Sequence, residues 1–363
     1  MRVVFRTDSS LEIGTGHVMR CLTLAAALLE RGAHCSFVCR ELKGNLIDLI
    51  EQRGFSVASL PSPASEEIDF GTDTPFHAHW LGVDWQTDAS QTYDAIDKTP
   101  VDWIVVDHYA LDARWEKLLR VSCKNILVID DLADRTHDCD LLLDQNLGRN
   151  LEDYSNLIQS DPRFLIGPKY ALLRPEFVNS RVTSLLRRKD PRFNRVLITL
   201  GGVDQHNISM KILDVLAGCN LPSLTEVSVI LGSTAPWIEQ VKARALEMVI
   251  PTEVLVSVNN MAEQMIRADL IIGGGGATTW ERCALGVPTI TINLASNQNA
   301  VAQAMVCVGA TAVVENGHDF EEKLKRTIEG LTFKEMVRYS EVSSSICDGG
   351  GTHRILHQMY ERT

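Results

Sequence analysis

The stretch RTDSSLEIGTGHVMRC at residues 6–21 links an apolar run to a helical pattern through a loop with two glycines. Met1 to Phe5 is the kind of apolar run that forms a buried parallel strand. Val18 to Glu30 has the mixed apolar and alanine-rich pattern of a helix that packs on a sheet. We therefore predict a strand, a glycine loop and a helix, with His17 at the C-terminal edge of the strand, where ligands bind in open α/β sheets.

His17 is our candidate for a catalytic base. Gly14 and Gly16 allow positive φ and let a substrate approach the backbone. The positive end of the helix dipole disfavours the imidazolium ion, so we expect the ring to be neutral at pH 7 and ready to accept a proton. The alternative is a histidine that only caps the helix.

Length, charge and cysteine content limit the class of protein. A chain of 363 residues is long enough for two domains of roughly 150 to 200 residues each. The formal net charge of −12 repels phosphate backbones, so we expect no nucleic-acid partner. The nine cysteines form no C-x-x-C pair, and no apolar run approaches the roughly 18 residues that a membrane span needs. We expect reduced thiols, a cytoplasmic location and no membrane span.

The first half alternates strand-like and helix-like segments, which predicts a doubly wound sheet. Between Ser62 and Asp97 the pattern breaks into Pro, Ser and acidic residues, and we interpret this segment as a solvated insertion followed by a helix that starts near Asp88. His77 and His79 within it have no third metal ligand at useful spacing, so we expect them to be surface residues. The predicted strands are Val3–Arg6, Cys35–Cys39, Trp103–Asp107, Ile126–Asp130 and Leu141–Asp144.

A second alternation of strands and helices starts at Val196, after a basic segment from Arg174 to Asn194 that we interpret as a linker. Phe333 to Thr363 is helical with an interruption at residues 348–351, and such a last helix often crosses back to the first domain. Together the halves predict an α/β fold of the GT-B type, with two doubly wound, Rossmann-like domains that face each other across a cleft. The strands predicted in the second half are Val196–Leu200, Val227–Leu231, Val254–Val256, Leu270–Gly273, Thr289–Ile292 and Thr311–Val314.

A glycine-rich segment, GGGGATTWE at residues 273–281, follows a predicted strand and opens a helix. Its bare amides, including that of Gly276, and the helix N-terminus make a site for a diphosphate, to which Thr278 and Thr279 add hydroxyl donors. Glu281, one turn into the helix, can accept hydrogen bonds from both hydroxyls of a ribose. The segment lacks the Gly-Lys-Ser/Thr ending of a Walker motif. The alternative is a tight turn without a ligand.

Three further loops of the second half are candidates to line the same nucleotide-sugar site. Gly202 lies in a strand-to-helix turn at the start of the second half, and we expect it to face the same cleft. Ala235 lies in a Gly-Ser-Thr-Ala-Pro loop that suits a nucleobase but equally a plain turn. Asn297 and Gln298 carry amides that suit a sugar with hydroxyl or acetamido groups, although Asn297 could instead cap a helix.

Polar residues also follow the predicted strands of the first half. Asp107 and Tyr109 end the strand that we expect beside the first strand, so Tyr109 could reach a reacting sugar and Asp107 could orient a neighbour or bind a hydroxyl. Asp130 and Asp131 end the next strand. Two adjacent carboxylates can hold a divalent ion, but adjacent strand residues point to opposite faces, so we favour structural capping.

The segment 6–21, the Asp107-His108-Tyr109 sequence and the loop 273–281 together resemble the family of bacterial hydrolases that act in pseudaminic acid biosynthesis. Members of that family convert UDP-2,4-diacetamido-2,4,6-trideoxy-β-L-altropyranose to UDP and the free sugar. The resemblance spans nearly the whole chain. The motifs of the second half are also similar to those of the related lipid II N-acetylglucosaminyltransferases, so they indicate UDP-sugar binding more than reaction type.

The resemblance implies roles for particular residues. The catalytic set would be His17 as the general base, with Tyr109 and Asn297 beside the reacting sugar. Water activated by His17 would attack the anomeric carbon with inversion while the loop amides hold the departing UDP, so neither a metal nor a cofactor is expected. The residues expected to bind the UDP-sugar substrate are Arg6, Asp8, Gly16, Gly202, Ala235, Gly276, Thr278, Thr279, Glu281 and Gln298.

On this interpretation, residues 1–178 form an N-terminal sugar-binding and catalytic domain, residues 193–345 a C-terminal UDP-binding domain and residues 346–363 a C-terminal helix. Three other interpretations stay open. A UDP-sugar glycosyltransferase would use His17 to deprotonate an acceptor hydroxyl. A non-hydrolysing epimerase would need carboxylates and further basic residues near the cleft, and a nucleotide-sugar sensor would leave His17 without a role.

Overall fold

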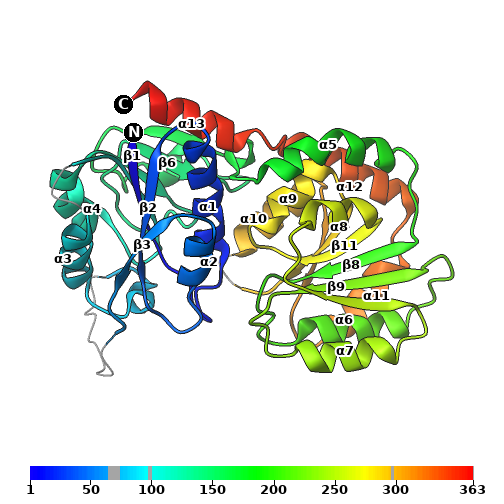
Figure 1. The fold of residues 1–363 in the computed structure, drawn as a ribbon. Coiled ribbons are helices and arrows are strands. Elements are labelled where there is room, and N and C mark those ends of the chain that lie inside the picture. The colour runs from blue at the N-terminus through cyan, green and yellow to red at the C-terminus, as the bar shows by residue number, and fades with distance from the viewer. Residues whose placement is uncertain (64–73, 97–99, 296–297, 363) are drawn as a thin grey trace. The chain divides into compact units, whose positions relative to one another are not determined.

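The structure is a computed structural model that describes residues 1–63, 74–96, 100–295 and 298–362. The chain divides into two compact units (Figure 1). Unit 1 consists of Met1–Leu172 and Gly350–Thr363, and unit 2 consists of Leu173–Gly349. Within the described residues, no helix has the length and apolar character that a membrane span requires. Each unit is a parallel sheet with helices on both faces, as the alternating segments predict.

The sheet of unit 1 has seven strands in the order β3-β2-β1-β4-β5-β6-β7. β1 and β4 are paired in register, with Thr7 opposite Asp107 at their carboxyl ends. The chain winds outward in opposite directions from this pair, so the switch point at which α/β sheets bind ligands lies here. The strands are β1 (Arg2–Thr7), β2 (His34–Arg40), β3 (Ser56–Leu60), β4 (Val101–Asp107), β5 (Cys123–Ile129), β6 (Leu141–Asp144) and β7 (Arg163–Ile166).

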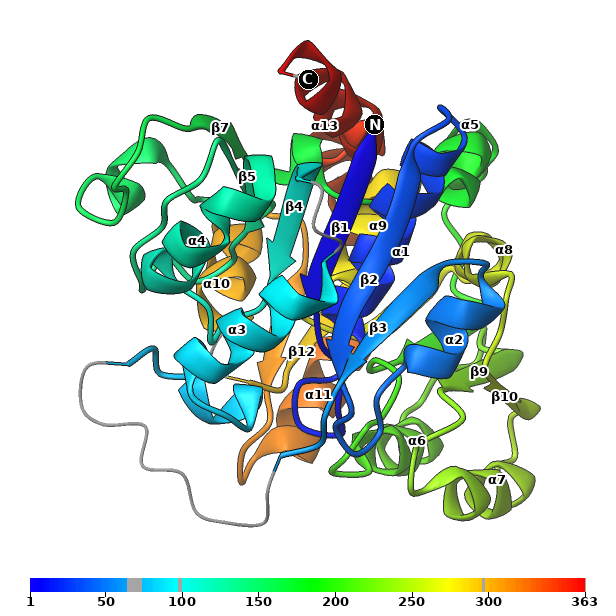
Figure 2. The same ribbon diagram turned by 60° about the vertical axis from the view of Figure 1, so that its left-hand side comes forward.

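Helices cover both faces of this sheet (Figure 2). On one face, α1, α2 and α13 pack over Phe5 and Phe37, whose stacked rings have centroids 4.8 Å apart. On the other face, α3 and α4 pack around the buried Trp115. The helices are α1 (Gly16–Leu29), α2 (Ile47–Gln52), α3 (Trp85–Ala95), α4 (Ala113–Leu119) and α13 (Gly351–Glu361), with short 3-10 helices η1 (Ala78–Leu81), η2 (Arg120–Ser122), η3 (Leu151–Tyr154) and η4 (Pro168–Tyr170).

The sheet of unit 2 has six strands in the order β10-β9-β8-β11-β12-β13. Its switch point lies between β8 and β11, where Thr199 is opposite Gly273. The loop that contains Gly202 and the glycine-rich loop therefore follow neighbouring strands. The strands are β8 (Arg195–Thr199), β9 (Glu226–Leu231), β10 (Thr252–Val256), β11 (Leu270–Gly274), β12 (Thr289–Asn293) and β13 (Ala312–Glu315).

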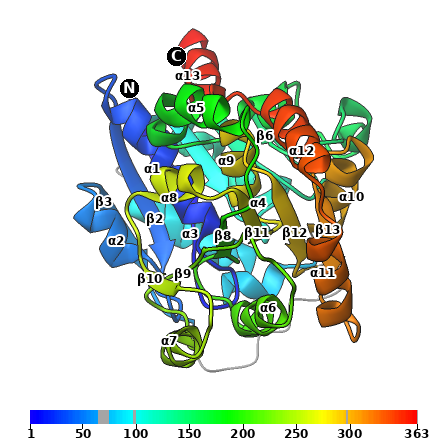
Figure 3. The same ribbon diagram turned by 90° about the vertical axis from the view of Figure 1, so that its right-hand side faces the viewer.

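The helices of unit 2 form two groups on opposite faces of its sheet (Figure 3). α6, α7 and α11 make one group, in which Ile212 and Leu324 contribute to the apolar core, and α5, α8, α9 and α12 make the other. The helices are α5 (Pro175–Arg188), α6 (Ile208–Ala217), α7 (Ile238–Leu246), α8 (Met261–Arg267), α9 (Thr278–Leu285), α10 (Asn299–Cys307), α11 (Phe320–Glu329) and α12 (Phe333–Ile346).

The structure corrects the prediction of a linker at residues 174–194. Most of that segment is helix α5, which packs in unit 2. Its arginines bind backbone carbonyl groups instead of extending into solvent: Arg181 donates to the carbonyl of Ser344 at 2.6 Å, and Arg187 donates to that of Ile266 at 2.9 Å. The arginines of residues 174–194 therefore form hydrogen bonds within unit 2, and their number does not indicate a linker exposed to solvent.

The interpretation of residues 62–97 as a solvated insertion is also partly wrong. Residues 64–73 and 97 lie outside the described residues, but α3 begins at Trp85, earlier than predicted, because Asp84 caps it by accepting a hydrogen bond from the amide of Thr87 at 2.8 Å. Asp88 faces the core. The predicted return of the last helix is confirmed, because α13 places Ile355 and Leu356 in the core of unit 1.

Candidate active site

His17 lies in the first turn of α1, at the carboxyl edge of β1. Its Nδ1 atom is 2.6 Å from Oδ1 of Asp107, the last residue of β4. Gly14 has a φ of +79°, as expected, whereas Gly16 has no positive φ because it is already the first residue of the helix. The strand, loop and helix predicted from residues 6–21 therefore bring His17 to the carboxylate that follows the neighbouring strand.

Arg20 completes a buried ion-paired cluster around Asp107. It lies one helical turn after His17 and donates to both carboxylate oxygens of Asp107, from Nε and Nη2, each at 2.6 Å. Burial alone would raise the pKa of Asp107, but the charge of Arg20 and the hydrogen bonds from Arg20 and His17 hold it well below its ordinary value. Asp107 is therefore a carboxylate that only accepts hydrogen bonds.

The Asp107 carboxylate sets which nitrogen of the His17 ring accepts a proton. In the neutral ring, the nitrogen that faces an acceptor carries the hydrogen. Arg20 Nη2 also lies 3.3 Å from Nδ1, but the carboxylate oxygen is nearer, at 2.6 Å. Nδ1 therefore carries the hydrogen and Nε2 keeps its lone pair. Among the described residues Nε2 has no hydrogen-bond partner, so the geometry suits a general base.

Tyr109 lies edge-on to His17, with ring centroids 4.6 Å apart. Its hydroxyl donates to Oδ2 of Asp131 at 2.8 Å, and Arg20 Nη1 donates to the same oxygen at 2.6 Å. Burial, with the negative charge of Asp131, raises the pKa of Tyr109 well above its ordinary value, so it stays a neutral phenol. His17, Arg20, Asp107, Tyr109 and Asp131 therefore form one connected cluster.

His77 is not the surface residue that the sequence predicts. Its ring lies 4.4 Å from that of Trp80 and 5.4 Å from that of Tyr109, measured between centroids, and Trp80 stacks on Tyr109 at 5.6 Å. His79 is exposed, as expected, and its Nε2 lies 3.0 Å from Oε1 of Glu12. The segment around η1 thus covers Tyr109, which is only 7% exposed.

Arg6 and Asp8, two predicted substrate ligands, belong to a buried network of ion pairs that also includes Asp88. Arg6 Nη1 and Nη2 donate to the carboxylate of Asp8 at 2.7 and 2.8 Å, and Nη2 also donates to Asp88 at 2.6 Å. Asp88 additionally accepts from Arg40 at 2.6 Å and from the indole of Trp115 at 3.0 Å. Arg6 is completely buried, and its direct contact with substrate stays a prediction.

Asp130 has the structural role that we favoured over metal binding. It accepts hydrogen bonds from the amides of Leu132 and Ala133 at 3.2 and 2.9 Å, and Arg135 Nη1 donates to it at 2.8 Å. Its neighbour Asp131 points instead into the His17 cluster. Over the described part of the chain, no group of three or more His, Cys, Asp or Glu side chains is arranged to hold a metal ion.

The glycine-rich loop of unit 2 runs from the end of β11 to the start of α9. None of the four glycines has a positive φ, so backbone conformation does not by itself require glycine at these positions. A Cβ atom on Gly273 would lie 2.5 Å from Nη1 of Arg282, and one on Gly275 would lie 2.9 Å from Oε1 of Gln298. Among the described residues, a Cβ on Gly276 would meet no atom within 4 Å. Packing in the described part of the chain therefore does not require glycine at position 276, and its amide is a candidate to bind a ligand.

Gly16 shares this property with Gly276. It has no positive φ, and a Cβ atom there would meet nothing within 4 Å. Neither backbone conformation nor packing among the described residues requires glycine at this position beside His17. The space that a side chain would fill is therefore open next to the candidate base, as expected for close approach of a substrate.

Glu281 lies at the end of the first turn of α9, and its side chain is 14% exposed. Burial raises its pKa to about 7, although the guanidinium of Arg174, 3.4 Å from Oε1, opposes that shift. A carboxylate with one long ion-pair contact has acceptor capacity left for ribose hydroxyls. Its role as a ribose ligand stays a prediction.

The remaining predicted residues of unit 2 lie in loops at the same carboxyl edge. The carbonyl of Gly202 accepts from the amide of Gly232 at 3.0 Å, which joins the loops after β8 and β9. Ala235, 7% exposed, packs in the second of these loops. Gln298 contacts the glycine-rich loop at Gly275, as noted. Asn297 lies outside the described residues.

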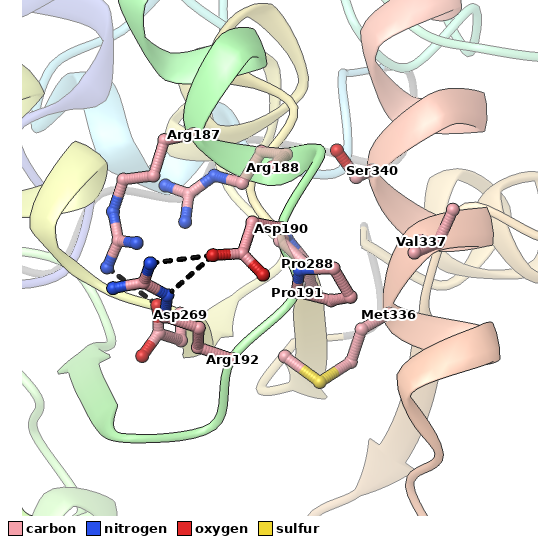
Figure 4. Close-up of a pocket in the computed structure, with 10 residues that line it drawn as sticks. All are labelled: Arg187, Arg188, Asp190, Pro191, Arg192, Asp269, Pro288, Met336, Val337 and Ser340. Carbon is pink, nitrogen blue, oxygen red and sulfur yellow. Dashed lines mark hydrogen bonds and ion pairs between the residues drawn. The ribbon is translucent and has the colours of Figure 1, made fainter.

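A separate small pocket in unit 2 lies away from these loops and contains none of the predicted site residues (Figure 4). In it, Arg187 and Arg188 end α5, and Arg192 pairs with Asp190. Arg188 donates to the carbonyls of Met265 and Ala268 at 3.0 and 2.5 Å, near the C-terminal end of α8. Those carbonyls carry the negative end of the helix dipole, so the arginines there have a structural role.

Sequence reasoning left Arg20, Asp107 and Asp131 out of the catalytic set. Arg20 was detectable from its spacing, because residues three apart on a helix share a face. Asp107 was predicted to end the strand beside β1 and to orient a neighbour or bind a hydroxyl, and the structure shows that this neighbour is His17. No local pattern separates Asp131 from its neighbour Asp130, because Asp130 accepts from its own loop and from Arg135, whereas Asp131 accepts from Arg20 and Tyr109, which are distant in the chain.

Comparison with known proteins identifies relatives of the chain. Residues 195–349, within unit 2, match the model of the glycosyltransferase family 28 C-terminal domain. The chain is 26% identical over 324 residues to UDP-2,4-diacetamido-2,4,6-trideoxy-β-L-altropyranose hydrolase of Campylobacter jejuni, an alignment that covers 89% of this chain and 100% of that protein. It is also 30% identical over 155 residues to the spore coat polysaccharide biosynthesis protein SpsG of Bacillus subtilis, covering 42% of this chain and 44% of that protein.

A protein of Methanocaldococcus jannaschii is 24% identical over 296 residues, which cover 80% of this chain and 55% of that protein. The chain thus spans about half the length of two of these relatives.

Solved structures establish the fold. MurG of Acinetobacter baumannii aligns over 99% of both chains with a TM-score of 0.69 at 14% identity. The glycosyltransferase TcCGT1, solved in complex with UDP, aligns over 100% of this chain and 99% of its own with a TM-score of 0.61 at 13% identity. The two Rossmann-like units of this chain therefore have the GT-B fold that the sequence predicts.

Proposed function

We propose that this protein hydrolyses a UDP-sugar at the anomeric carbon, with His17 as the general base. One observation carries the proposal: Asp107 holds Nδ1 of His17 at 2.6 Å, which leaves Nε2 as the proton acceptor of the ring. General bases in many enzymes are oriented by a carboxylate in this way. Arg20 holds the carboxylate in turn with two hydrogen bonds.

In the proposed reaction, Nε2 of His17 takes a proton from a water molecule while the oxygen of that water bonds to the anomeric carbon. The bond from that carbon to the β-phosphate oxygen breaks, and its electron pair leaves with UDP. Direct displacement inverts the configuration at the anomeric carbon. Tyr109 and Asn297 adjoin the sugar in this proposal, and the diphosphate leaves without needing a carboxylic acid to protonate it.

The nucleotide is assigned to unit 2. The Gly276 amide and the hydroxyls of Thr278 and Thr279 bind the diphosphate, and Glu281 binds the ribose. Because amides and a helix N-terminus take the place of a divalent ion, the proposed reaction is independent of metal. Gly202, Ala235 and Gln298 complete the nucleotide and sugar contacts, and residues 1–178, 193–345 and 346–363 keep the roles that the sequence predicts.

The proposed substrate is UDP-2,4-diacetamido-2,4,6-trideoxy-β-L-altropyranose, and the proposed setting is pseudaminic acid biosynthesis in the cytoplasm. The Campylobacter jejuni relative, a hydrolase of this UDP-sugar, supports this choice, because its full length aligns with this chain at 26% identity. The position of His17 after a glycine loop, with its partner Asp107, provides the base that such a reaction needs.

The match of residues 195–349 to a glycosyltransferase domain favours a second candidate, a UDP-sugar glycosyltransferase. The matched segment carries the proposed nucleotide site but not His17, so it supports UDP-sugar binding without selecting water over an acceptor hydroxyl. A transferase would use the same histidine to deprotonate the acceptor.

The test is incubation of the full chain with the proposed substrate and EDTA, without any acceptor. We expect UDP to be released, and we expect His17→Asn to lose turnover by roughly a hundredfold or more while UDP affinity is kept. His34→Asn, which changes an exposed histidine at the start of β2, is the matched control. Release of UDP only after an acceptor is added would favour the transferase, and unchanged turnover in His17→Asn would remove the assigned base.

A further inference from the structure

We propose that Arg282 is the buried positive charge that balances a phosphate-bearing ligand at the glycine-rich loop, and that it positions the two threonine hydroxyls as donors to that ligand. This inference rests on the proposed nucleotide site of unit 2. It assigns a function to a side chain that does not itself touch the ligand, so Arg282 is a positioning residue.

The guanidinium of Arg282 lies directly beneath the loop. Nη2 donates to the carbonyl of Gly274 at 2.7 Å and to Oγ1 of Thr279 at 3.0 Å, and Nη1 donates to Oγ1 of Thr278 at 3.1 Å. The residue is only 2% exposed. The glycine at position 273 makes this placement possible, because a Cβ there would lie 2.5 Å from Nη1. Part of the glycine run is therefore explained by the space that Arg282 occupies.

The hydrogen-bond partners of Arg282 are all neutral, and unlike those of Arg188 they lie at the positive end of a helix. Arg6, Arg20 and Arg135 each pair with an aspartate at 2.8 Å or less. Arg188 binds carbonyls at the C-terminal end of α8, where the helix dipole is negative. Among the described residues, Arg282 has no ion pair with a carboxylate. Its neighbour Glu281 contacts Arg174 instead.

Among the described residues of unit 2, no hydrogen-bonded carboxylate balances the charge of Arg282, and its neighbour Glu281 attracts it only without a direct contact. Burial lowers its pKa to about 10. The guanidinium also reaches the N-terminal end of α9, where the dipole is already positive. Burying a charge without a counter-charge is costly, and an anion bound at the loop would remove that cost. The local electrostatics thus favour a ligand with negative charge.

The same hydrogen bonds orient the threonines. A hydroxyl has one hydrogen to donate and accepts through its oxygen. Because Arg282 donates to both Oγ1 atoms, Thr278 and Thr279 keep their hydroxyl hydrogens for another acceptor. Phosphate oxygens are such acceptors. Arg282 therefore contributes both charge and donor orientation to a phosphate group, and contributes neither to an uncharged nucleoside.

This difference defines the experiment. The affinities of the full chain for UDP and for uridine are measured by calorimetry, together with those of Arg282→Gln, Arg282→Lys and the control Arg188→Gln. Arg188, at the end of α5, is also a buried arginine that donates only to carbonyl groups among the described residues, but its partners lie at α8 and not at the glycine-rich loop. We expect Arg282→Gln to lower the preference for UDP over uridine by on the order of tenfold or more. Arg282→Lys, which keeps the charge, should retain part of the preference, and Arg188→Gln should retain all of it.

An unchanged preference in Arg282→Gln would overturn the inference, and so would an equal loss of UDP and uridine affinity, which would mark a purely structural role. Wild-type protein without any preference for UDP over uridine would instead contradict the proposed nucleotide site itself. The two failures are therefore distinguishable.

Discussion

Nδ1 of His17 and Oδ1 of Asp107 lie 2.6 Å apart, although 90 residues separate them in the chain. The distance follows from topology, because Asp107 ends β4 beside β1, and His17 begins the helix that follows β1. The switch point of the sheet thus supplies both members of a base and orienter pair. This pair is the part of the molecule on which the proposed chemistry depends most.

Replacement of Asp107 by Asn should separate catalysis from nucleotide binding. An amide at this position can donate to Nδ1, which would move the ring hydrogen to Nε2 and remove the acceptor. We expect turnover to fall by roughly a hundredfold or more with UDP affinity unchanged, since the nucleotide is assigned to unit 2. Steady-state kinetics and calorimetry measure both quantities. Asp161→Asn, an exposed change in unit 1, is the control, and equal turnover in the two variants would contradict the orienting role.

UDP affinity should decrease as the pH falls through 7. The pKa of Glu281 is raised to about 7, and the proposed ribose contact needs the ionised carboxylate. Below that pKa, binding must first displace a proton, so affinity should drop by up to about tenfold per pH unit. Titrations with UDP at several pH values measure this slope. Glu281→Gln should bind UDP more weakly at high pH, and its UDP affinity should lose the pH dependence that Glu281 causes. An identical pH dependence in the variant would show that another group titrates.

The same raised pKa has a consequence for stability. The folded protein holds the proton of Glu281 more tightly than the unfolded chain, whose glutamate titrates near 4.5. The contribution of this residue therefore favours folding at low pH and is lost as the pH rises from about 4.5 to about 7. In Glu281→Gln this pH-dependent loss should be absent.

Gly276→Ala should weaken UDP binding without weakening the fold. An added Cβ meets no atom of the described residues within 4 Å and no positive φ is strained, but we expect it to occupy the approach to the loop amide. Gly218→Ala is a matched control, because its Cβ would make only ordinary contacts at 3.6 Å or more and it lies at the far end of α6. Thermal unfolding of both variants measures the stability of the fold, and calorimetry measures their affinity for UDP. Normal UDP affinity in Gly276→Ala would place the ligand elsewhere.

Asp88→Asn should destabilise unit 1. The carboxylate of Asp88 accepts from Arg6, Arg40 and Trp115 in a fully buried position. Removing one charge from a buried ion-paired network typically costs about 3 to 5 kcal/mol in the free energy of unfolding. Denaturant unfolding followed by tryptophan fluorescence measures it. Asp94→Asn changes an exposed residue of the same helix, and equal stability of the two variants would mean that the network contributes little.

Most of the fold follows from periodicity, because the central strands are continuous apolar runs. β3 and β7 were not predictable in this way. Ser56–Leu60 is half exposed at the edge of the sheet and therefore lacks an apolar signature, and Arg163–Ile166 is only four residues long. α5 was obscured by its arginines, whose partners are carbonyl groups far away in the sequence.

The site was predictable where a local pattern carries the chemistry, as for His17 and the glycine-rich loop. The site was not predictable where the partner of a side chain is distant in the sequence and comes close only in the folded chain. The sequence Arg6-x-Asp8 looks like a pair of ligands, yet both side chains are committed to a network completed by Asp88, 80 residues away from Asp8. Arg282 was hidden for the same reason, since its isolation from carboxylates is visible only in space.

The attack of water on the anomeric carbon is tested most directly by hydrolysis of the UDP-sugar in oxygen-18 water, with mass spectrometry of both products. If water activated by His17 attacks carbon, the label will be found in the free sugar and not in UDP. Label in the phosphate of UDP would show attack at phosphorus and would contradict the assignment of His17 as the base that activates water toward carbon.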